Sequence, residues 1–156
     1  MKLILLRHAK SSWSDPWQDD HDRPLNDRGR RDAPRIGGWL RAKGHLPSLT
    51  LCSTATRTRE TLATLALPPH GTRFRDDLYH AAPATILTLA RAQSTACLLI
   101  IGHNPGIAEA AAKACRTPPR HPKFDAYPTA ACTVIDISES WPGTLQGFVV
   151  PADLRA

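Results

Sequence analysis

The chain has 156 residues, 42% hydrophobic and 22% charged, and this balance is typical of a folded globular protein rather than a disordered one. Twenty Lys and Arg against 14 Asp and Glu give a formal net charge of +6, which suits anionic partners. No apolar run approaches the ~18 residues of a membrane span, and the first ten residues do not resemble a signal peptide. We therefore expect a cytoplasmic protein with no membrane association and one domain over residues 1–156.

The cysteines are scattered along the chain, with no C-x-x-C pair. Without a signal peptide there is no reason to expect an oxidising compartment. We therefore expect free, mostly buried thiols at Cys52, Cys97, Cys115 and Cys132.

Apolar runs that stop abruptly at polar residues predict strands, and segments between an N-cap residue and a Gly or Pro predict helices. A polar stretch over residues 9–24 reads as a long loop, of the kind that often carries function. In chain order, the expected elements are a strand over 2–6, a helix from Asn26 or Asp27 to about Lys43, a strand over 49–53, a helix over 56–67, a helix over 83–92, a strand over 97–101, a helix over 105–115, and strands over 130–137 and 144–150.

Alternating strands and helices predict an α/β fold, a three-layer sandwich whose mostly parallel central sheet has helices on both faces. In such sheets, ligands bind beyond the carboxyl ends of the strands. That rule directs attention to three strand ends: Arg7-His8, the segment from Ser53 onward, and Gly102-His103.

The residue types at these strand ends suit phosphoryl chemistry. A neutral imidazole such as that of His8 can attack phosphorus without an activating base, and the neighbouring Arg7 can hold phosphate oxygens with its planar guanidinium. Arg57 and Arg59 fall in the first turn of one expected helix, but residues two apart point in different directions, so one enters the site and Arg59 is the better candidate for a solvated face. His103 could stabilise charge on a transferring phosphoryl group.

Four motifs in this order and spacing resemble the histidine phosphatase superfamily, and most closely its small SixA-type phosphohistidine phosphatases. The resemblance covers about residues 1–150. Its motifs are Leu6-Arg7-His8-Ala9-Lys10-Ser11, Asp22-Arg23-Pro24-Leu25 with Arg28-Gly29, Ser53-x-x-x-Arg57-x-x-x-Thr61, and Gly102-His103-Asn104-Pro105.

The resemblance implies a phosphoglycerate-mutase-like fold and a role for each matching residue. His8 would be the nucleophile that becomes phosphorylated, Arg7 and Arg57 would hold the phosphoryl oxygens, and His103 would stabilise the transferring group. Arg23 would add a further phosphate contact, and we include Ser11 and Asn104 among the substrate-binding candidates. Neither a metal ion nor an organic cofactor is implied, so we expect a metal-independent hydrolase.

The sequence departs from related branches at the proton donor. The mutase-like branch has a Glu after the second Arg, where this chain reads RDDLYH over residues 75–80; the acid phosphatase branch has an Asp where this chain has Asn104. An alkoxide leaving group needs a proton, whereas the nitrogen of a phosphoramidate can leave as neutral imidazole. We therefore favour phosphohistidine on a partner protein as the substrate, unless Asp76, Asp77 or an acid of residues 15–22 supplies the proton.

Other functions remain alternatives. A broad small-molecule phosphomonoesterase would use the same residues, and a non-catalytic module that binds phosphorylated ligands would need only the charge. The spacing from Cys52 to Arg57 does not fit a cysteine phosphatase, and the dispersed basic residues do not predict a nucleic-acid partner.

The loop over residues 11–22 has two interpretations. It is either a rim that docks a partner or, preferably, a loop pinned to the body by Trp13 and Trp17. We expect a monomer or a weak dimer.

Overall fold

Six strands form one sheet in the computed structural model, which describes residues 1–155. The order across the sheet is β3-β2-β4-β1-β5-β6. The four strands from β3 to β1 run parallel, while β5 is antiparallel to both β1 and β6. Their bounds are β1 Lys2–Arg7, β2 Leu49–Ser53, β3 Gly71–Arg75, β4 Cys97–Gly102, β5 Cys132–Asp136 and β6 Thr144–Val149.

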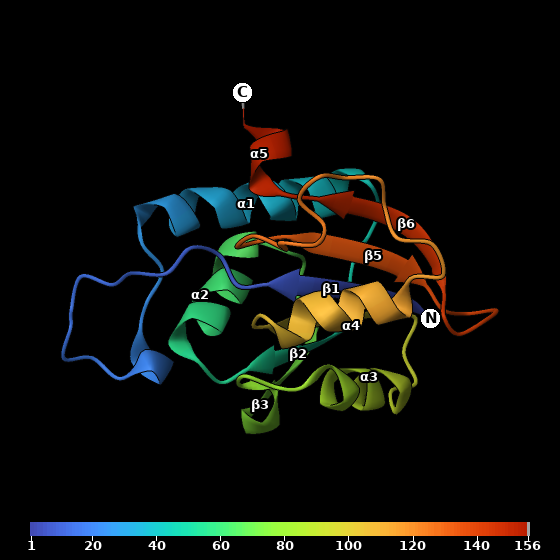
Figure 1. Ribbon diagram of the computed structural model, residues 1–156, viewed down its shortest axis with the longest axis horizontal. Helices are drawn as coiled ribbons and strands as arrows, with labels where there is room; N and C mark the ends of the chain where they lie inside the picture. Colours follow the sequence, from blue (N-terminus) through green and yellow to red (C-terminus); the bar gives the residue numbers. More distant parts are fainter. Residues whose placement is uncertain (156) are drawn as a thin grey trace.

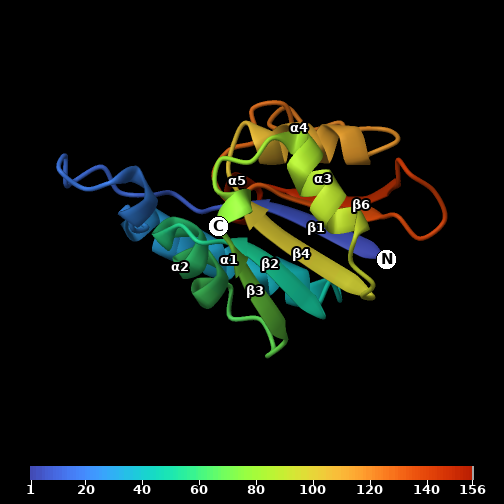
Figure 2. The ribbon, with the colours of Figure 1, turned by 90° about the horizontal axis from the view of Figure 1, so that it is seen from below.

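Helices cover both faces of this sheet, so the predicted three-layer α/β sandwich is confirmed (Figure 1). Figure 2 shows α3 and α4 on one side and α1 and α2 on the other. The helices are α1 Asp27–Ala42, α2 Thr56–Leu65, α3 Pro83–Arg91, α4 Gly106–Ala114 and α5 Pro151–Leu154, with short 3-10 turns η1 Asp20–Asp22 and η2 Asp76–Leu78.

The central strand β1 supplies both layers of the core because successive side chains of a strand point to opposite faces. Leu3 and Leu5 pack with the residues of α3 and α4, and Ile4 and Leu6 pack with those of α1 and α2. All four are fully buried, which contributes roughly 2 kcal/mol each relative to exposure. The apolar run that predicts this strand therefore also fixes the position of Arg7 and His8 at its end.

The structure corrects several predicted elements. The edge strand β3 was not predicted, because its sequence GTRFR is mostly exposed and lacks an apolar alternation; α5 was also missed. The predicted helix over 56–67 ends at Leu65, where Ala66 adopts a left-handed φ of 53°. The side chain of Arg41, from α1, donates hydrogen bonds to the carbonyl oxygens of Leu65 and Ala66 at 3.0 and 2.7 Å. These bonds satisfy carbonyl groups that have no partner within α2 at its C-terminal end. The strand over 130–137 is shorter, at Cys132–Asp136.

The start of α1 lies against the segment that follows β1. Of the two predicted caps, Asn26 is the one observed: its side chain accepts from the Gly29 backbone amide at 2.9 Å, and its own backbone amide donates to the Lys10 carbonyl at 3.0 Å. A Cβ at Gly29 would lie 2.2 Å from that same Lys10 oxygen. Glycine at this position therefore lets the helix hold the backbone two residues beyond His8.

All four cysteines are free and buried, as predicted. Within residues 1–155, no helix combines the length and the apolar character needed to span a membrane.

Candidate active site

The carboxyl ends of three adjacent parallel strands, β2, β4 and β1, meet at one edge of the sheet. A cavity of about 180 Å³ lies there, and all seven predicted site residues line it. A larger hollow of about 580 Å³ beside α3 and Trp141 has a single charged lining residue, Arg91, so it lacks converging polar groups. The residues lining the smaller cavity are Arg7, His8, Lys10, Ser11, Trp13, Asp20, Arg23, Arg57, His80, His103, Asn104 and Thr129.

His8 is buried with its Nε2 atom left free for chemistry. Its Nδ1 lies 2.7 Å from the Ala9 carbonyl oxygen, and because a carbonyl can only accept, Nδ1 carries the hydrogen. The lone pair is then on Nε2. Burial is the main cause that lowers the pKa of His8 to about 3, with the nearby Arg7, Arg57 and Arg23 acting in the same direction. The imidazole is therefore neutral near pH 7, the form that can act as a nucleophile.

Three arginines bring positive charge to the cavity. Arg57 comes from the first turn of α2 and is 1% exposed, whereas Arg59 lies outside, 4.1 Å over the ring of Phe74, as the residue spacing predicts. Arg7 donates to the Tyr127 carbonyl at 3.1 Å, and burial followed by the charge of Arg57 lowers its pKa.

The third arginine is held by the segment that follows β1. Arg23 is buried, and its Nη1 donates to the hydroxyl of Ser11 at 2.9 Å. Ser11 thus lies in the cavity wall where it positions Arg23.

His103 lies next to His8, with ring centres 5.3 Å apart. Its Nε2 and the hydroxyl of Ser53, the last residue of β2, are 2.8 Å apart. Burial is the main cause that lowers the pKa of His103 to about 2, and the charge of Arg57 acts in the same direction. The adjacent Asn104 donates from Nδ2 to the Tyr127 carbonyl at 2.9 Å, which fixes its orientation.

Unpartnered polar atoms gather at this cavity. In the described part of the chain, the buried side-chain nitrogen and oxygen atoms without a hydrogen-bond partner are Arg7 Nε, Arg57 Nε, His103 Nδ1 and Asn104 Oδ1. Leaving such an atom unsatisfied costs about 1–3 kcal/mol. All four belong to residues that line the cavity, which indicates a site arranged for a polar ligand rather than for maximal stability.

The carboxylate of Asp20 accepts hydrogen bonds from two of these arginines, Arg23 and Arg57. Its Oδ1 accepts from Arg23 Nε at 3.1 Å, and its Oδ2 accepts from Arg57 Nη2 at 3.0 Å, from His80 Nε2 at 3.1 Å and from the hydroxyl of Tyr79. Partial burial works to raise the pKa of Asp20, but the hydrogen bonds from Tyr79, His80 and Arg57 outweigh it and hold the pKa far below the ordinary value. Asp20 is therefore an acceptor and not a proton donor in this arrangement.

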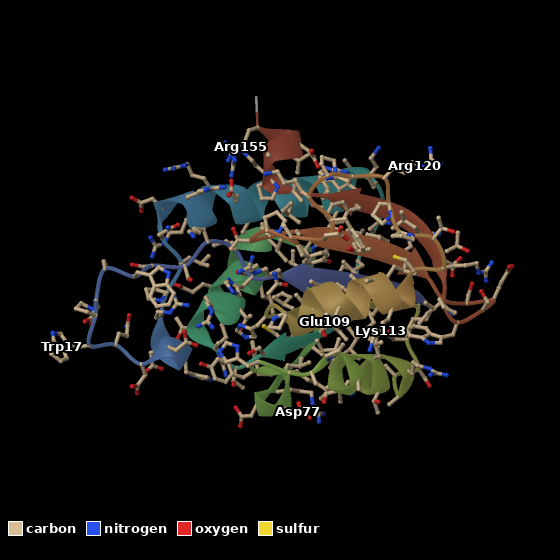
Figure 3. All side chains as sticks on the ribbon, in the orientation of Figure 1. Trp17, Asp77, Glu109, Lys113, Arg120 and Arg155 are labelled. Carbon is tan, nitrogen blue, oxygen red and sulfur yellow. The ribbon has the colours of Figure 1, made fainter. Side chains whose placement is uncertain are left out.

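The other acids considered from the sequence, Asp76 and Asp77 together with Asp15, Asp19 and Asp22 of the loop, are not part of the cavity lining. Asp76 accepts a hydrogen bond from Thr54 Oγ1 at 2.7 Å. Asp77 pairs with Arg75 at 2.8 Å and lies at the outer edge of the molecule (Figure 3).

Sequence reasoning missed His80 as a cavity residue and Tyr79 as a partner of Asp20. Both follow β3, so they reach the same sheet edge as the other strand ends. A correct assignment of the edge strand would have pointed to them.

The preferred interpretation of the loop over residues 11–22 is wrong. Trp13 is 72% and Trp17 is 93% exposed, so the two indoles do not pin the loop to the body. Trp13 instead covers the guanidinium of Arg23, with Cζ 3.5 Å from the ring centre. The loop projects from the body, and Trp17 points away at its far end (Figures 1 and 3).

Comparisons with known proteins identify the family of this chain. The family model of the histidine phosphatase superfamily (branch 1) matches residues 3–78. An uncharacterized protein of Mycobacterium tuberculosis is 36% identical, over 94% of this chain and 99% of its own length. An uncharacterized chloroplastic protein of Arabidopsis thaliana is 39% identical, over 70% of this chain and 57% of its own length.

Solved structures similar to this chain include SixA-type proteins. A protein of Agrobacterium tumefaciens assigned as phosphohistidine phosphatase SixA superposes with a TM-score of 0.82 and 30% identity, covering 96% of this chain and 97% of the other. The protein histidine phosphatase SixA in complex with tungstate gives a TM-score of 0.84 at 22% identity, over 99% and 100% of the two chains, and this likeness supports the fold alone. The chain belongs to the histidine phosphatase superfamily. Its family and its SixA-type neighbours make it a phosphatase, a class of hydrolase.

Proposed function

We propose that this protein hydrolyses phosphohistidine on a partner protein through a covalent phosphohistidine intermediate at His8. The observation that carries the proposal is the neutral, buried His8 with a free Nε2, in a cavity with three arginines and four unpartnered polar atoms. The charges of Arg7, Arg23 and Arg57 suit a phosphoryl group, whose oxygens carry the negative charge of the transition state.

In the proposed mechanism, Nε2 of His8 attacks phosphorus and the bond to the leaving group breaks. Arg7 and Arg57 hold the phosphoryl oxygens, and His103 stabilises the charge that develops on them. Water then attacks the phosphorus on His8, which releases inorganic phosphate and restores the imidazole. The protein groups supply the positive charge for both steps, and we propose that neither step requires a metal ion.

A protein substrate is supported by the surroundings of the cavity. The loop over residues 11–22 contributes Ser11, Trp13 and Asp20 to the cavity lining and carries Trp17 almost fully exposed at its far end, and aromatic side chains are enriched where proteins bind one another. We propose that this loop contacts the phosphorylated partner. Buried free thiols suit a reducing compartment, and we propose the cytoplasm.

A second function, hydrolysis of small phosphate esters, is favoured by one observation. The imidazole of His80 lines the cavity, so a group able to give a proton to an oxygen leaving group lies beside the phosphate-binding residues.

The test measures phosphate release from a phosphohistidine protein and from an aryl phosphate, side by side and in the presence of a chelator, for the wild type and for His8→Ala. We expect preferential turnover of phosphohistidine and its loss in His8→Ala, together with a ³²P-labelled, acid-labile enzyme intermediate in the wild type. Equal turnover of both substrates would favour the general esterase. Phosphate release that persists in His8→Ala would overturn the proposed nucleophile.

A further inference from the structure

The cavity contains a ring N–H, that of His80, to which the reaction of His8 with phosphohistidine assigns no role. His80 follows the 3-10 turn η2, is about half exposed, and directs Nε2 to Oδ2 of Asp20 at 3.1 Å. Because an ionised carboxylate only accepts, Nε2 of His80 carries the hydrogen. The N–H of His80 therefore points at the place where Arg57 and Tyr79 also direct their donors.

The position of His80 is held by the surrounding backbone. Leu78 is fully buried on one side of it, and on the other a Cβ at Gly106 would lie 1.9 Å from the Ala81 carbonyl oxygen, so α4 packs directly on this segment. His80 itself has a left-handed φ of 50°. Such a conformation is uncommon outside glycine, costs of order 1–3 kcal/mol, and is often found at functional sites.

The placement relative to the nucleophile also suits a proton donor. The ring of His103 lies 5.3 Å from that of His8 and 5.1 Å from that of His80, measured between ring centres. A phosphoryl group bound against His103 is thus within reach of both the nucleophile and His80. The anionic oxygen of Asp20 shows that the donors around His80 can converge on a negatively charged oxygen.

We infer that His80 is the catalytic acid that protonates an oxygen leaving group, an inference that rests on the proposed function. With this acid, the site hydrolyses phosphate monoesters as well as phosphohistidine. Substrate displaces the carboxylate of Asp20 from Arg57, and the Nε2 proton of His80 then faces the ester oxygen.

Hydrolysis of an ester then proceeds in two steps. Nε2 of His8 forms a bond to phosphorus, the P–O ester bond breaks, and its electron pair goes to the leaving oxygen. That oxygen takes the proton of the His80 imidazolium and departs as an alcohol. Neutral His80 then accepts a proton from the water whose oxygen attacks the phosphorus on His8, and inorganic phosphate leaves.

The decisive variant is His80→Asn, because Asn tolerates the left-handed backbone and can donate a hydrogen bond but cannot serve as an acid near neutral pH. The substrates are ethyl phosphate, whose alkoxide leaves poorly, and 2,4-dinitrophenyl phosphate, whose phenolate leaves without protonation. We expect kcat/KM of His80→Asn to fall by about 10²–10⁴-fold on ethyl phosphate and by less than about fivefold on the dinitrophenyl ester. Added imidazole should restore part of the lost activity on ethyl phosphate in His80→Ala.

The matched control is His121→Asn, since His121 also contacts an aspartate, Asp153, at 3.0 Å but does not line the cavity. It should keep wild-type activity on both esters. An equal loss on both esters in His80→Asn, or no loss on either, would overturn the role of His80. A wild type that cleaves phosphohistidine but neither ester would overturn this inference and leave the proposed function intact, whereas unchanged activity in His8→Ala would overturn the proposed function itself.

Discussion

Asp20 and Arg57 are joined by two hydrogen bonds, one from Nη2 to the carboxylate at 3.0 Å and one from Nη1 to the Asp20 carbonyl oxygen at 2.6 Å. The guanidinium that the proposed mechanism assigns to the substrate is therefore occupied by a carboxylate of the same chain. An incoming phosphoryl group carries the same sign of charge and must compete with Asp20 for Arg57.

Removing that competing charge should strengthen anion binding. For Asp20→Asn we expect the competitive inhibition constant of inorganic phosphate to fall by about tenfold, equivalent to ~1.4 kcal/mol. Asp22→Asn is the control, because Asp22 is largely exposed and its ion pair is with His21 at 3.8 Å. An inhibition constant that stays the same or rises in Asp20→Asn would mean that Asp20 remains on Arg57 when phosphate binds.

Arg57→Lys should keep the charge and lose the planar pair of donors. We expect kcat/KM to fall by about 10²–10³-fold, the loss typical when one preorganised donor to a developing charge is removed. The control is Arg59→Lys, on the same helix but exposed and stacked on Phe74, which should change kcat/KM by less than about twofold. Similar losses in both variants would argue against a specific role for Arg57.

The buried His8 should make stability fall in acid. In the unfolded chain an imidazole takes up a proton below pH ~6.5, whereas folded His8, with a pKa of about 3, does not. Acid therefore favours the unfolded state, and the contribution present at pH 7 is lost between about pH 6.5 and 3. Chemical denaturation from pH 7 to 4.5 should show a slope for the wild type that exceeds that of His8→Asn by up to ~1.4 kcal/mol per pH unit. Parallel slopes for the two proteins would contradict the assignment of a neutral buried His8.

The contact between α1 and the segment after His8 predicts a difference between two glycines of one helix. Gly29→Ala places a Cβ 2.2 Å from the Lys10 carbonyl and should lower the free energy of unfolding by about 1–3 kcal/mol, with a parallel loss of turnover. Gly38→Ala meets its nearest atom, of the Arg41 side chain, at 3.8 Å, and should raise stability by up to ~1 kcal/mol. Urea denaturation distinguishes the two, and a neutral Gly29→Ala would show that the close approach has no energetic role.

Trp17→Ala tests whether the projecting loop contacts a protein substrate. Since the indole is 93% exposed, we expect stability to change by no more than ~0.5 kcal/mol. We expect KM for a phosphohistidine protein to rise about fivefold or more, because an exposed indole buried in a complex contributes to binding, while KM for an aryl phosphate stays constant. Unchanged KM for both substrates would remove the loop from substrate recognition.

The sequence alone was sufficient to predict most of the strands and helices that position the site residues. Apolar runs such as residues 2–6 and 97–101 predict buried strands because their side chains can be satisfied only in a core, and the polar residues that end them then lie at the ligand-binding edge. Arg7, His8 and His103 could be found in this way, and the two-residue spacing separated Arg57 from Arg59. Local chemistry also narrowed the start of α1 to Asn26 or Asp27, since capping depends on residues adjacent in the chain, and the structure shows that Asn26 is the cap.

Only the tertiary structure decided which groups meet across the sheet edge. Asp20 belongs to a loop and His80 follows an exposed edge strand, so neither position carries an apolar pattern that reports its place in space. Their approach depends on the packing of α4 on the Ala81 backbone and on the path of the loop after β1. Burial, which lowers the pKa of both His8 and His103 and leaves Nδ1 of His103 without a hydrogen-bond partner, likewise results from contacts between distant segments. The sequence determined the chemical groups and the strand ends that carry them, whereas long-range packing decided their charge states and their partners.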